Sequence, residues 1–517
     1  MNNKKHRIMK NNKSIIFSIT AFFLFFACKN DTSDPFADFN PYDSDLGKRI
    51  EAYQDAKFPN LANSKTGNPA LYIDFSTGIF QAFKNPINSS LLKSVYGNLS
   101  GELDVFELNY DSIRKIPSSN PDLVGRMVVD NNSYHGIYAP IKDAVTQIVS
   151  KNNDALLVTD FEEYYPASSG RSEIIDIPYL KESFIKWLSK GNSIRFYISN
   201  YNENGVAKKL YFTVFNCGNL SESGMISKVE NSLGSLPHFD LSNKSYNLSQ
   251  EYGGEKKGGI YYDNSVQDEN AKNVLELNKE SYINGLKNNN NFEFYQFNLD
   301  WAHIEKAKSQ MKIDDFFRKL FIDLSNEDSY SLGDLVVKVY DVTDDFEYFA
   351  KCNEANDSKN IPDTEKGKDG ENKFKDSETN PIALSCYDTK GKILDEWIYK
   401  NDKVSKELPE VFTFNKKLFE NNKTDNNKKV ELAVSFDTKF NLNNIENPQG
   451  LIRVDIVINN SNPSTPSDEL FKWQSTTKKG SQNVALFESI KNTLLDDKVK
   501  PTNKVIYSYY IKTNNNK

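Results

Sequence analysis

Two patterns of apolar residues follow one another along this chain, and they divide it into two parts. Between residues 70 and 240, short runs that are apolar throughout (70–73 and 155–158) alternate with segments whose apolar residues recur at helical spacing, such as 137–148. Runs of the first kind are typical of parallel strands buried on both faces. The alternation predicts an α/β domain at 70–240, a doubly wound, mostly parallel sheet with helices on both faces.

Strand patterns dominate the end of the chain. Alternating or β-branched apolar runs recur there at four places, 335–340, 430–436, 451–458 and 505–511. One segment, 484–494, has apolar residues at helical spacing and interrupts these runs. We therefore expect a β-rich, sandwich-like domain at 331–517.

The residues between these two domains, 241–330, have a less regular pattern and are interpreted as a mixed connecting region. An alternating run at 292–297 predicts a strand, and 315–324 fits an amphipathic helix. Within the second domain, residues 353–380 contain few large apolar side chains, which predicts a long mobile loop.

The N-terminus has the pattern of an export signal. A basic leader precedes an apolar run at 14–27 that is too short to span a membrane comfortably, which predicts a signal peptide at 1–27. The run ends in Phe-Phe-Ala-Cys, which resembles a lipobox, so Cys28 is the predicted lipidation site. The alternative is an ordinary secretory signal with an incidental cysteine.

Lipid chains on Cys28 would anchor the protein stably in the cell outer membrane, facing the surface or the periplasm. Residues 29–34, Lys-Asn-Asp-Thr-Ser-Asp, resemble the charged tags of surface lipoproteins of Bacteroidota. The stretch 28–69 is rich in Asp, Asn, Pro and Ser, and it is predicted to be a tether between the lipid and the folded part.

Composition agrees with a folded, exported protein. The chain has 517 residues, of which 38% are hydrophobic, and a net charge of −7 that argues against a nucleic-acid partner. After Cys28 only three cysteines remain. Cys352 and Cys386 bracket one loop and are the best candidates for a disulfide, with two buried thiols as the alternative.

Polar residues follow the two apolar strands of the first domain. Asp74 and Ser76 come directly after residues 70–73, and Asp160 follows 155–158. Ligands collect just beyond the carboxyl ends of strands in open α/β sheets. Carboxylate and hydroxyl oxygens suit a hard cation such as Mg2+. The alternative role for Asp74 is to cap a helix that begins near Thr77.

These motifs and the order of elements resemble the von Willebrand factor A domain. That family has an Asp-x-Ser-x-Ser motif after its first strand, which Asp74 and Ser76 match, and a Thr-Asp-Gly-Glu-like turn, which residues 159–162 match with Phe161 in place of glycine. In the loop where the family has a metal-binding threonine, Ser133 offers a hydroxyl.

The resemblance implies a metal-ion-dependent adhesion site. Its Mg2+ or Mn2+ would be held by Asp74, Ser76, Ser133 and Asp160, with one coordination position left for an acidic side chain of a protein partner. Gly78 stands where the family has its second serine. Because water would replace the missing hydroxyls, we expect weaker metal binding. The alternative is a retained fold whose metal site has decayed.

Classical catalytic motifs are hard to find in the sequence, and no pair of its many carboxylates stands out as catalytic. His135, His238 and His303 stand singly, and there is no Gly-x-Ser-x-Gly string. We therefore expect a protein that is not an enzyme and that binds a protein partner in adhesion or envelope assembly. Two alternatives remain: glycan binding, suggested by 27 Tyr and 34 Phe, and metal-dependent hydrolysis at Asp74 and Asp160.

Overall fold

The structure is a computed structural model, and it describes most of the chain beyond the N-terminus. The described residues are 35–59, 67–99, 103–116, 121–164, 174–218, 224–243, 246–251, 275–277, 286, 291–299, 315–325, 328–357, 364–366, 372–374, 385–388, 391–424, 428–440, 444–447, 449–474 and 482–513. The predicted signal peptide and Cys28 lie outside these residues. Within them, no helix has both the length and the apolar character that a membrane span requires.

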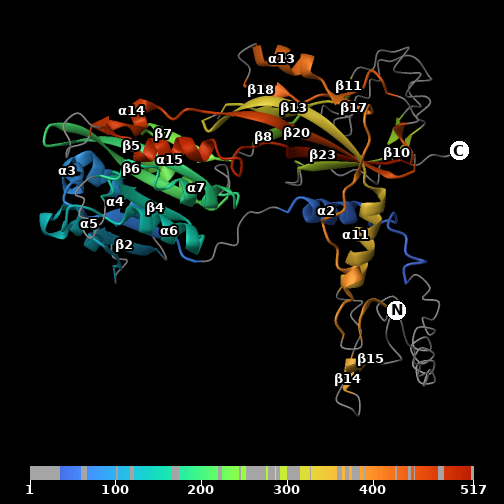
Figure 1. The fold of residues 1–517 in the computed structure, drawn as a ribbon, viewed down its shortest axis with the longest axis horizontal. Helices are drawn as coiled ribbons and strands as arrows, with labels where there is room; N and C mark the ends of the chain where they lie inside the picture. Colours follow the sequence, from blue (N-terminus) through green and yellow to red (C-terminus); the bar gives the residue numbers. More distant parts are fainter. Residues whose placement is uncertain are drawn as a thin grey trace, which may run out of the picture. The chain divides into compact units, whose positions relative to one another are not determined.

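A seven-stranded sheet forms the centre of the first domain (Figure 1). Its strands are β1 (Ala70–Asp74), β2 (Asp104–Asn109), β3 (Ser112–Lys115), β4 (Ala155–Thr159), β5 (Ser193–Glu203), β6 (Val206–Asn216) and β7 (His238–Ser242). They lie in the order β3-β2-β1-β4-β6-β5-β7. The two runs predicted to be buried strands, β1 and β4, are buried at every position and lie side by side.

Parallel pairing is confined to the middle of this sheet. β1 pairs in parallel with both β2 and β4, whereas the other four pairings are antiparallel. The departure from a parallel sheet comes from β5 and β6, which form a hairpin rather than a crossover through a helix. Asn204 and Gly205 make its turn with φ of 51° and 89°, and Asn-Gly is the strongest short hairpin signal.

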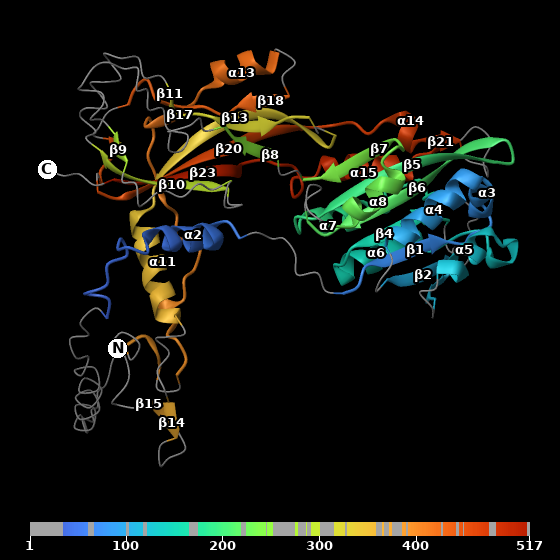
Figure 2. The same cartoon turned by 180° about the vertical axis from the view of Figure 1, so that it is seen from behind.

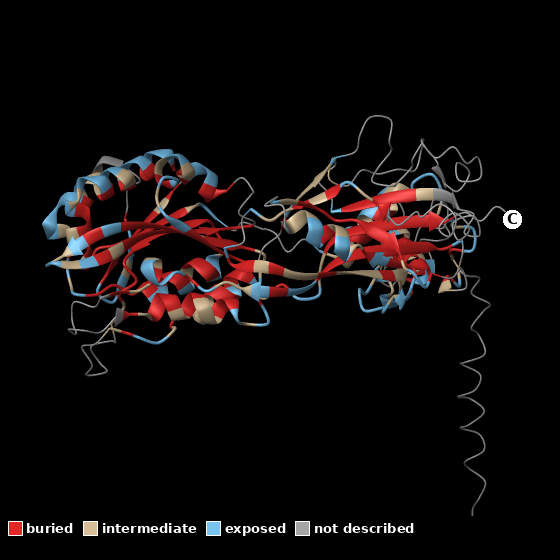
Figure 3. Ribbon diagram, turned by 90° about the horizontal axis from the view of Figure 1, so that it is seen from above, coloured by how far each residue is buried: buried red, intermediate tan, exposed pale blue. Residues whose placement is uncertain are grey.

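Helices cover both faces of the seven-stranded sheet, as predicted (Figure 3). One face packs against α3 (Ile79–Lys84), α4 (Pro86–Asn98), α5 (Pro121–Val129) and α8 (Met225–Leu233). The other face packs against α6 (Ile141–Lys151), α7 (Lys181–Leu188), α14 (Asp468–Phe471) and α15 (Ala485–Leu494). The α/β architecture of the first domain is therefore confirmed.

Two of these helices come from the end of the chain. The helix at 484–494 was expected inside the β-rich domain, but α15 packs against the seven-stranded sheet and its Ser489 hydroxyl accepts a hydrogen bond from the backbone N–H of Leu180. From α14, Phe471 packs against Phe196 and Phe239 with ring centroids 5.6 and 5.3 Å away. The α/β domain is thus assembled from two distant parts of the sequence.

The β-rich part contains a six-stranded sheet and two small sheets (Figure 2). The six strands are, in order, β16 (Lys406–Glu407), β13 (Tyr330–Asp341), β20 (Leu451–Pro463), β23 (Lys504–Thr513), β10 (Phe292–Leu299) and β9 (Leu275–Leu277). The small sheets are β11 (Asp315–Phe317), β19 (Val434–Phe436) and β17 (Phe412–Phe414), and β18 (Lys429–Glu431), β12 (Leu320–Asp323) and β8 (Asn247–Gln250). One apolar core joins residues of all three sheets, which agrees with a layered β-rich domain.

The interpretation of 241–330 as a connecting region was wrong, because β8 to β12 are strands of the β-rich part. The helix predicted at 315–324 is also wrong. Its residues form β11 and β12, and between them Lys319 has φ of 66°, which a helix cannot accommodate. Phe317, Leu320 and Ile322 are buried, so strand pairing and burial override the apparent helical spacing.

The described residues up to Lys57, together with those from Val342 to Ser405, form a compact unit of their own. The prediction of a tether over 28–69 was wrong for the described residues up to 57, because α2 (Leu46–Lys57) buries Leu46, Ile50 and Tyr53. The hydroxyl of Tyr53 donates to Asp345 Oδ2 at 2.7 Å, on α11 (Thr343–Asn356). Apolar residues at positions i, i+4 and i+7 were the signal for this helix.

The structure of the same unit also differs from two further predictions, a mobile loop at 353–380 and a disulfide between Cys352 and Cys386. Residues 353–356 continue α11, and Thr364–Lys366 pairs with Asn372–Phe374, so the predicted mobile loop at 353–380 has helix and strand within its described residues. Cys352 and Cys386 are both buried cysteines, and no disulfide joins them. The alternative of buried thiols agrees with the structure.

Candidate functional site

The two acidic turns singled out in the sequence lie side by side at one edge of the seven-stranded sheet. Asp74 is the last residue of β1, and Asp160 directly follows β4. The two strands are adjacent and parallel, with Ile73 opposite Val158. Their carboxyl ends therefore bring the two carboxylates to the same edge, as the sequence predicted.

Asp74 is almost fully buried, with 1% of its surface exposed. Its Oδ1 accepts a hydrogen bond from the backbone N–H of Ser76 at 2.8 Å, and its Oδ2 accepts one from the hydroxyl of Thr159 at 2.7 Å. Burial, and then the charge of Asp160, raise the pKa of Asp74 to about 7. The carboxyl group thus holds the first turn to the end of β4.

Asp160 is buried in the same way and holds the second turn. Its Oδ1 accepts from the backbone N–H of Glu162 at 3.0 Å, and its Oδ2 accepts from the hydroxyl of Tyr201 at 2.9 Å. Burial raises the pKa of Asp160. Tyr201 belongs to β5, so this carboxylate connects the β4 turn to the β5–β6 hairpin.

A buried lysine lies among the acidic side chains at this edge. Lys208 Nζ is 2.7 Å from Glu162 Oε2, 2.5 Å from Glu203 Oε2 and 3.9 Å from Asp160 Oδ2, and its side chain is 2% exposed. Burial alone would lower the pKa of Lys208, but the charges of Asp160 and Glu162 outweigh it and raise that pKa. We call Asp74, Asp160, Glu162, Glu203 and Lys208 the acid–lysine cluster.

The hairpin places Lys208 at the edge because it extends beyond the end of β4. Thr159, the last residue of β4, lies opposite Tyr211, so the first residues of β6 project past it. On β6, Lys208 occupies the same face as Leu210 and Phe212, which are fully buried. That alternation was a signal for a buried lysine that sequence reasoning missed.

Glu162 links the cluster to the C-terminal part of the chain. Its Oε1 accepts a hydrogen bond from Trp473 Nε1 at 3.0 Å. Burial, and then the charge of Asp160, raise the pKa of Glu162 to about 7. One carboxylate therefore contacts both the β5–β6 hairpin, through Lys208, and the segment that follows α14.

The serines predicted as metal ligands are placed differently. Ser76 is buried beside Asp74, and its carbonyl accepts from the backbone N–H of Ile79 at the start of α3. Ser133 ends a short 3-10 helix (Asn131–Ser133), and no hydrogen bond among the described residues joins its hydroxyl to the cluster. The structure therefore brings Asp74, Ser76 and Asp160 together and leaves Ser133 outside their hydrogen-bond network.

The acidic side chains at this edge already have partners within the protein. The described residues contain no group of three His, Cys, Asp or Glu side chains arranged to hold a metal ion. Both carboxylate oxygens of Asp74 already accept hydrogen bonds from protein donors. The positive charge nearest to Asp160 and Glu162 is the ammonium group of Lys208, where a metal site would need open oxygen ligands.

Three loops at this edge of the sheet are joined to one another by backbone hydrogen bonds. The backbone N–H of Thr77 donates to Gly136 O, and that of Tyr110 donates to Tyr138 O, both at 3.0 Å. Gly136 has φ of +78°, and a Cβ there would lie 2.8 Å from Cδ2 of Tyr110, so this position requires glycine. The loops are thus packed tightly around the carboxyl ends of β1 and β2.

These loops expose two large apolar side chains. Tyr110 is 46% exposed and Ile137 is 63% exposed. The ring of Tyr110 stacks on that of Tyr138 at 4.6 Å, and the hydroxyl of Tyr138 donates to Asp111 Oδ1 at 2.9 Å. We call the exposed surface of Tyr110, Asp111 and Ile137 the rim surface.

Comparison of this chain with protein-family models, with curated proteins and with solved structures finds no match. What the site can do is therefore argued from its own geometry. Asp74, Asp160 and Glu162 are buried and hydrogen-bonded, which suits them to fixing loops, while the rim surface is the part that another molecule can reach.

Proposed function

We propose that this chain is a lipid-anchored protein of the cell envelope that binds a protein partner through the rim surface of its α/β domain. The observation that carries the proposal is that the turn held by Asp74 is bonded through Thr77 to the loop that exposes Ile137, and that this loop is bonded in turn to Tyr110. Loops that are already held in place lose little conformational freedom when a partner binds to the apolar side chains they expose.

The rim surface has the chemistry of a protein interface. Tyrosine and other aromatic residues are enriched at such interfaces, where a rigid ring provides contact area at a small entropic cost. The ring of Tyr110 is held by its stacking on Tyr138, so binding would order few additional bonds. Asp111 beside it adds a negative charge that favours a partner with a basic group.

The buried cluster supports binding more than catalysis. A catalytic carboxylate must reach substrate, whereas Asp74 and Asp160 are 1% and 4% exposed and both accept hydrogen bonds from the protein. The same burial argues against the metal-dependent hydrolase considered from the sequence. The hydrogen bonds around Asp74 and Asp160 instead favour a role in holding the loops.

A divalent cation remains the second candidate for this edge, in keeping with the resemblance to the von Willebrand factor A domain. Asp74, Ser76 and Asp160 carry the oxygen atoms that Mg2+ or Mn2+ prefers. To bind there, the ion would have to compete with Lys208 for Asp160. We propose that the ammonium group serves as the built-in cation, so partner binding needs no added metal.

The membrane anchor of the proposal is a lipid on Cys28, with the protein in the cell outer membrane. Mass spectrometry of the protein extracted from its native membrane tests this part directly. A mature N-terminus at Cys28 that carries acyl chains is the expected result. An N-terminus elsewhere, without lipid, would refute the anchor but not the binding surface.

A crosslinking experiment tests the binding surface. A photo-crosslinking amino acid is introduced at Ile137, and as a control at Val404, which is 96% exposed in the other compact unit. We expect a specific crosslinked protein from position 137 that persists in the presence of a chelator and disappears with Tyr110→Ser. Crosslinking that a chelator abolishes would favour the cation-dependent alternative.

Glycan binding would give a different result. A sugar ring can stack on an exposed aromatic face, and Tyr110 offers one. Binding to a glycan array that Tyr110→Ser removes, together with no protein crosslink from position 137, would replace the protein partner by a carbohydrate.

A further inference from the structure

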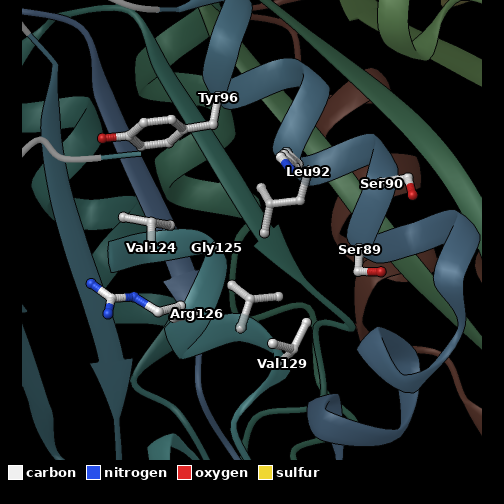
Figure 4. A pocket seen from close by; sticks show the side chains of 10 residues that line it. Ser89, Ser90, Leu92, Tyr96, Val124, Gly125, Arg126 and Val129 are labelled. Carbon is white, nitrogen blue, oxygen red and sulfur yellow. The ribbon is translucent and has the colours of Figure 1, made fainter. Parts of the chain in front are cut away.

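We propose that the groove between α4 and α5 binds a small amphipathic anion, an apolar chain that ends in a carboxylate. The groove has a volume of about 650 Å3, within the range of roughly 300–1,000 Å3 that is usual for small-molecule sites. Figure 4 shows side chains of both helices facing this space. None of its lining residues belongs to the acid–lysine cluster or the rim surface.

The walls of the groove are apolar. Leu92 on α4 and Val124 and Val128 on α5 are buried side chains of the domain core that reach the groove, and Val129 continues this surface outward with 59% of its area exposed. Because Val129 is exposed and lies next to buried valines, the apolar wall of the groove extends to the protein surface. A hydrocarbon chain laid along these side chains would remove apolar surface from water.

The charge of the groove points to an anion. Among the described residues that line it are Lys93 from α4 and Arg126 from α5, together with Ser89 and Ser90, and none of these described residues is Asp or Glu. The whole chain, by contrast, has 71 acidic and 64 basic residues. Cationic side chains on both helices beside an apolar wall match a carboxylate attached to a hydrocarbon chain.

Gly125 provides a second, independent observation in favour of a ligand site in this groove. It lies in the middle of α5, where glycine is less favourable than alanine. Its φ is not positive, and a Cβ added to it would meet no atom within 4 Å, so neither backbone conformation nor packing calls for glycine. The absence of a side chain at Gly125 leaves the groove between the two helices open.

Gly97 provides a matched comparison on the neighbouring helix. It lies in the last turn of α4, a Cβ there would also meet nothing within 4 Å, and it does not line the groove. The first carbon of a side chain can be added at either position without a clash. Only a leucine at 125 would occupy the space proposed for the ligand.

Binding is measured on the purified full chain by saturation-transfer NMR with octanoate, and with octylammonium as the probe of opposite charge. We expect octanoate to bind with millimolar or better affinity and octylammonium to bind at least tenfold more weakly. Gly125→Leu should weaken octanoate binding at least tenfold, whereas Gly97→Leu should change it less than twofold. Thermal unfolding of each variant shows that it is folded.

A charge reversal provides a test that does not alter the core. Lys93 is exposed, so Lys93→Glu should leave the fold intact and weaken octanoate binding at least fivefold. Lys186→Glu, an exposed lysine of α7 on the other face of the sheet, is the control and should have no effect. Octanoate binding that survives Gly125→Leu and Lys93→Glu, or that octylammonium equals, overturns the proposal. None of these outcomes bears on the rim surface.

Discussion

The hydroxyl of Thr159 donates a hydrogen bond of 2.7 Å to Oδ2 of Asp74. This bond joins the ends of two neighbouring parallel strands, β1 and β4, and it is buried. Thr159 also accepts from the backbone N–H of Phe161 at 3.2 Å, so one hydroxyl connects both acidic turns. The two turns therefore form one unit, and its strength can be measured.

Thr159→Val removes the hydroxyl and keeps the volume of the side chain. Because Asp74 Oδ2 would lose a buried partner, we expect the free energy of unfolding to fall by about 1–3 kcal/mol. Thr213→Val is the control: the hydroxyl of Thr213 is buried and has no hydrogen-bond partner among the described residues. This second substitution should be neutral or stabilising in urea unfolding, and equal losses for both would contradict the assignment.

Lys208→Met leaves the carboxylates of the acid–lysine cluster without their cation. Removing one partner of a buried ion pair leaves an uncompensated charge, so the free energy of unfolding should fall by about 3–5 kcal/mol. The adjacent Lys209, which donates to Asn200 at an exposed site, serves as the control. Lys209→Met should cost no more than about 0.5 kcal/mol. Chemical unfolding followed by tryptophan fluorescence measures both.

The raised pKa values of Asp74 and Glu162, each about 7, predict how stability depends on pH. A carboxyl group whose pKa is higher in the folded state binds more protons there than in the unfolded chain, where its pKa is about 4. The free energy of unfolding should therefore fall as pH rises from about 4 to about 7, by up to ~1.4 kcal/mol per pH unit for each group.

Asp74→Asn tests this sign, because asparagine stays neutral and its Oδ1 can still accept one of the two hydrogen bonds that Asp74 accepts. The slope of the unfolding free energy between pH 5 and 7 should be less negative in this variant than in the natural chain. Glu182→Gln, at an exposed position of α7, should leave the slope unchanged. A slope that Asp74→Asn does not alter would mean that Asp74 is ionised throughout this range.

Two glycines of the α/β domain should respond in opposite ways to alanine. Gly125→Ala places a better helix former in open space, so the free energy of unfolding should rise by about 0.5–1 kcal/mol. Gly136→Ala should lower it, because a Cβ at φ of +78° would lie 2.8 Å from Cδ2 of Tyr110. Thermal unfolding of both variants, compared with the natural chain, measures the difference.

Much of the α/β domain could be predicted from local pattern. The apolar runs of β1 and β4 had to be buried on both faces, and Asp74 and Asp160 at their carboxyl ends had to share an edge of one sheet. The hairpin of β5 and β6 was also predictable from Asn204-Gly205, but the regular alternation of strands and helices favoured a parallel sheet instead.

The remaining features depend on contacts that no local pattern specifies. The amphipathic face of α15 requires some apolar partner, but nothing in residues 485–494 indicates that the partner is a sheet formed far earlier in the chain. Lys208 had the alternation of an inward-facing residue, yet a charged side chain is buried only where several acids surround it. Those acids come from two separate segments, the turn after β4 and the end of β5, which only the fold brings together.

The return of α14 and α15 to the seven-stranded sheet has a consequence for how the protein is made. The rings of Phe196, Tyr211 and Phe239 pack against Phe471, which is synthesised after the whole β-rich part up to β20. During synthesis these rings therefore have no cover until α14 has left the ribosome. Closure of the α/β domain thus has to wait for the synthesis of a large part of the β-rich part.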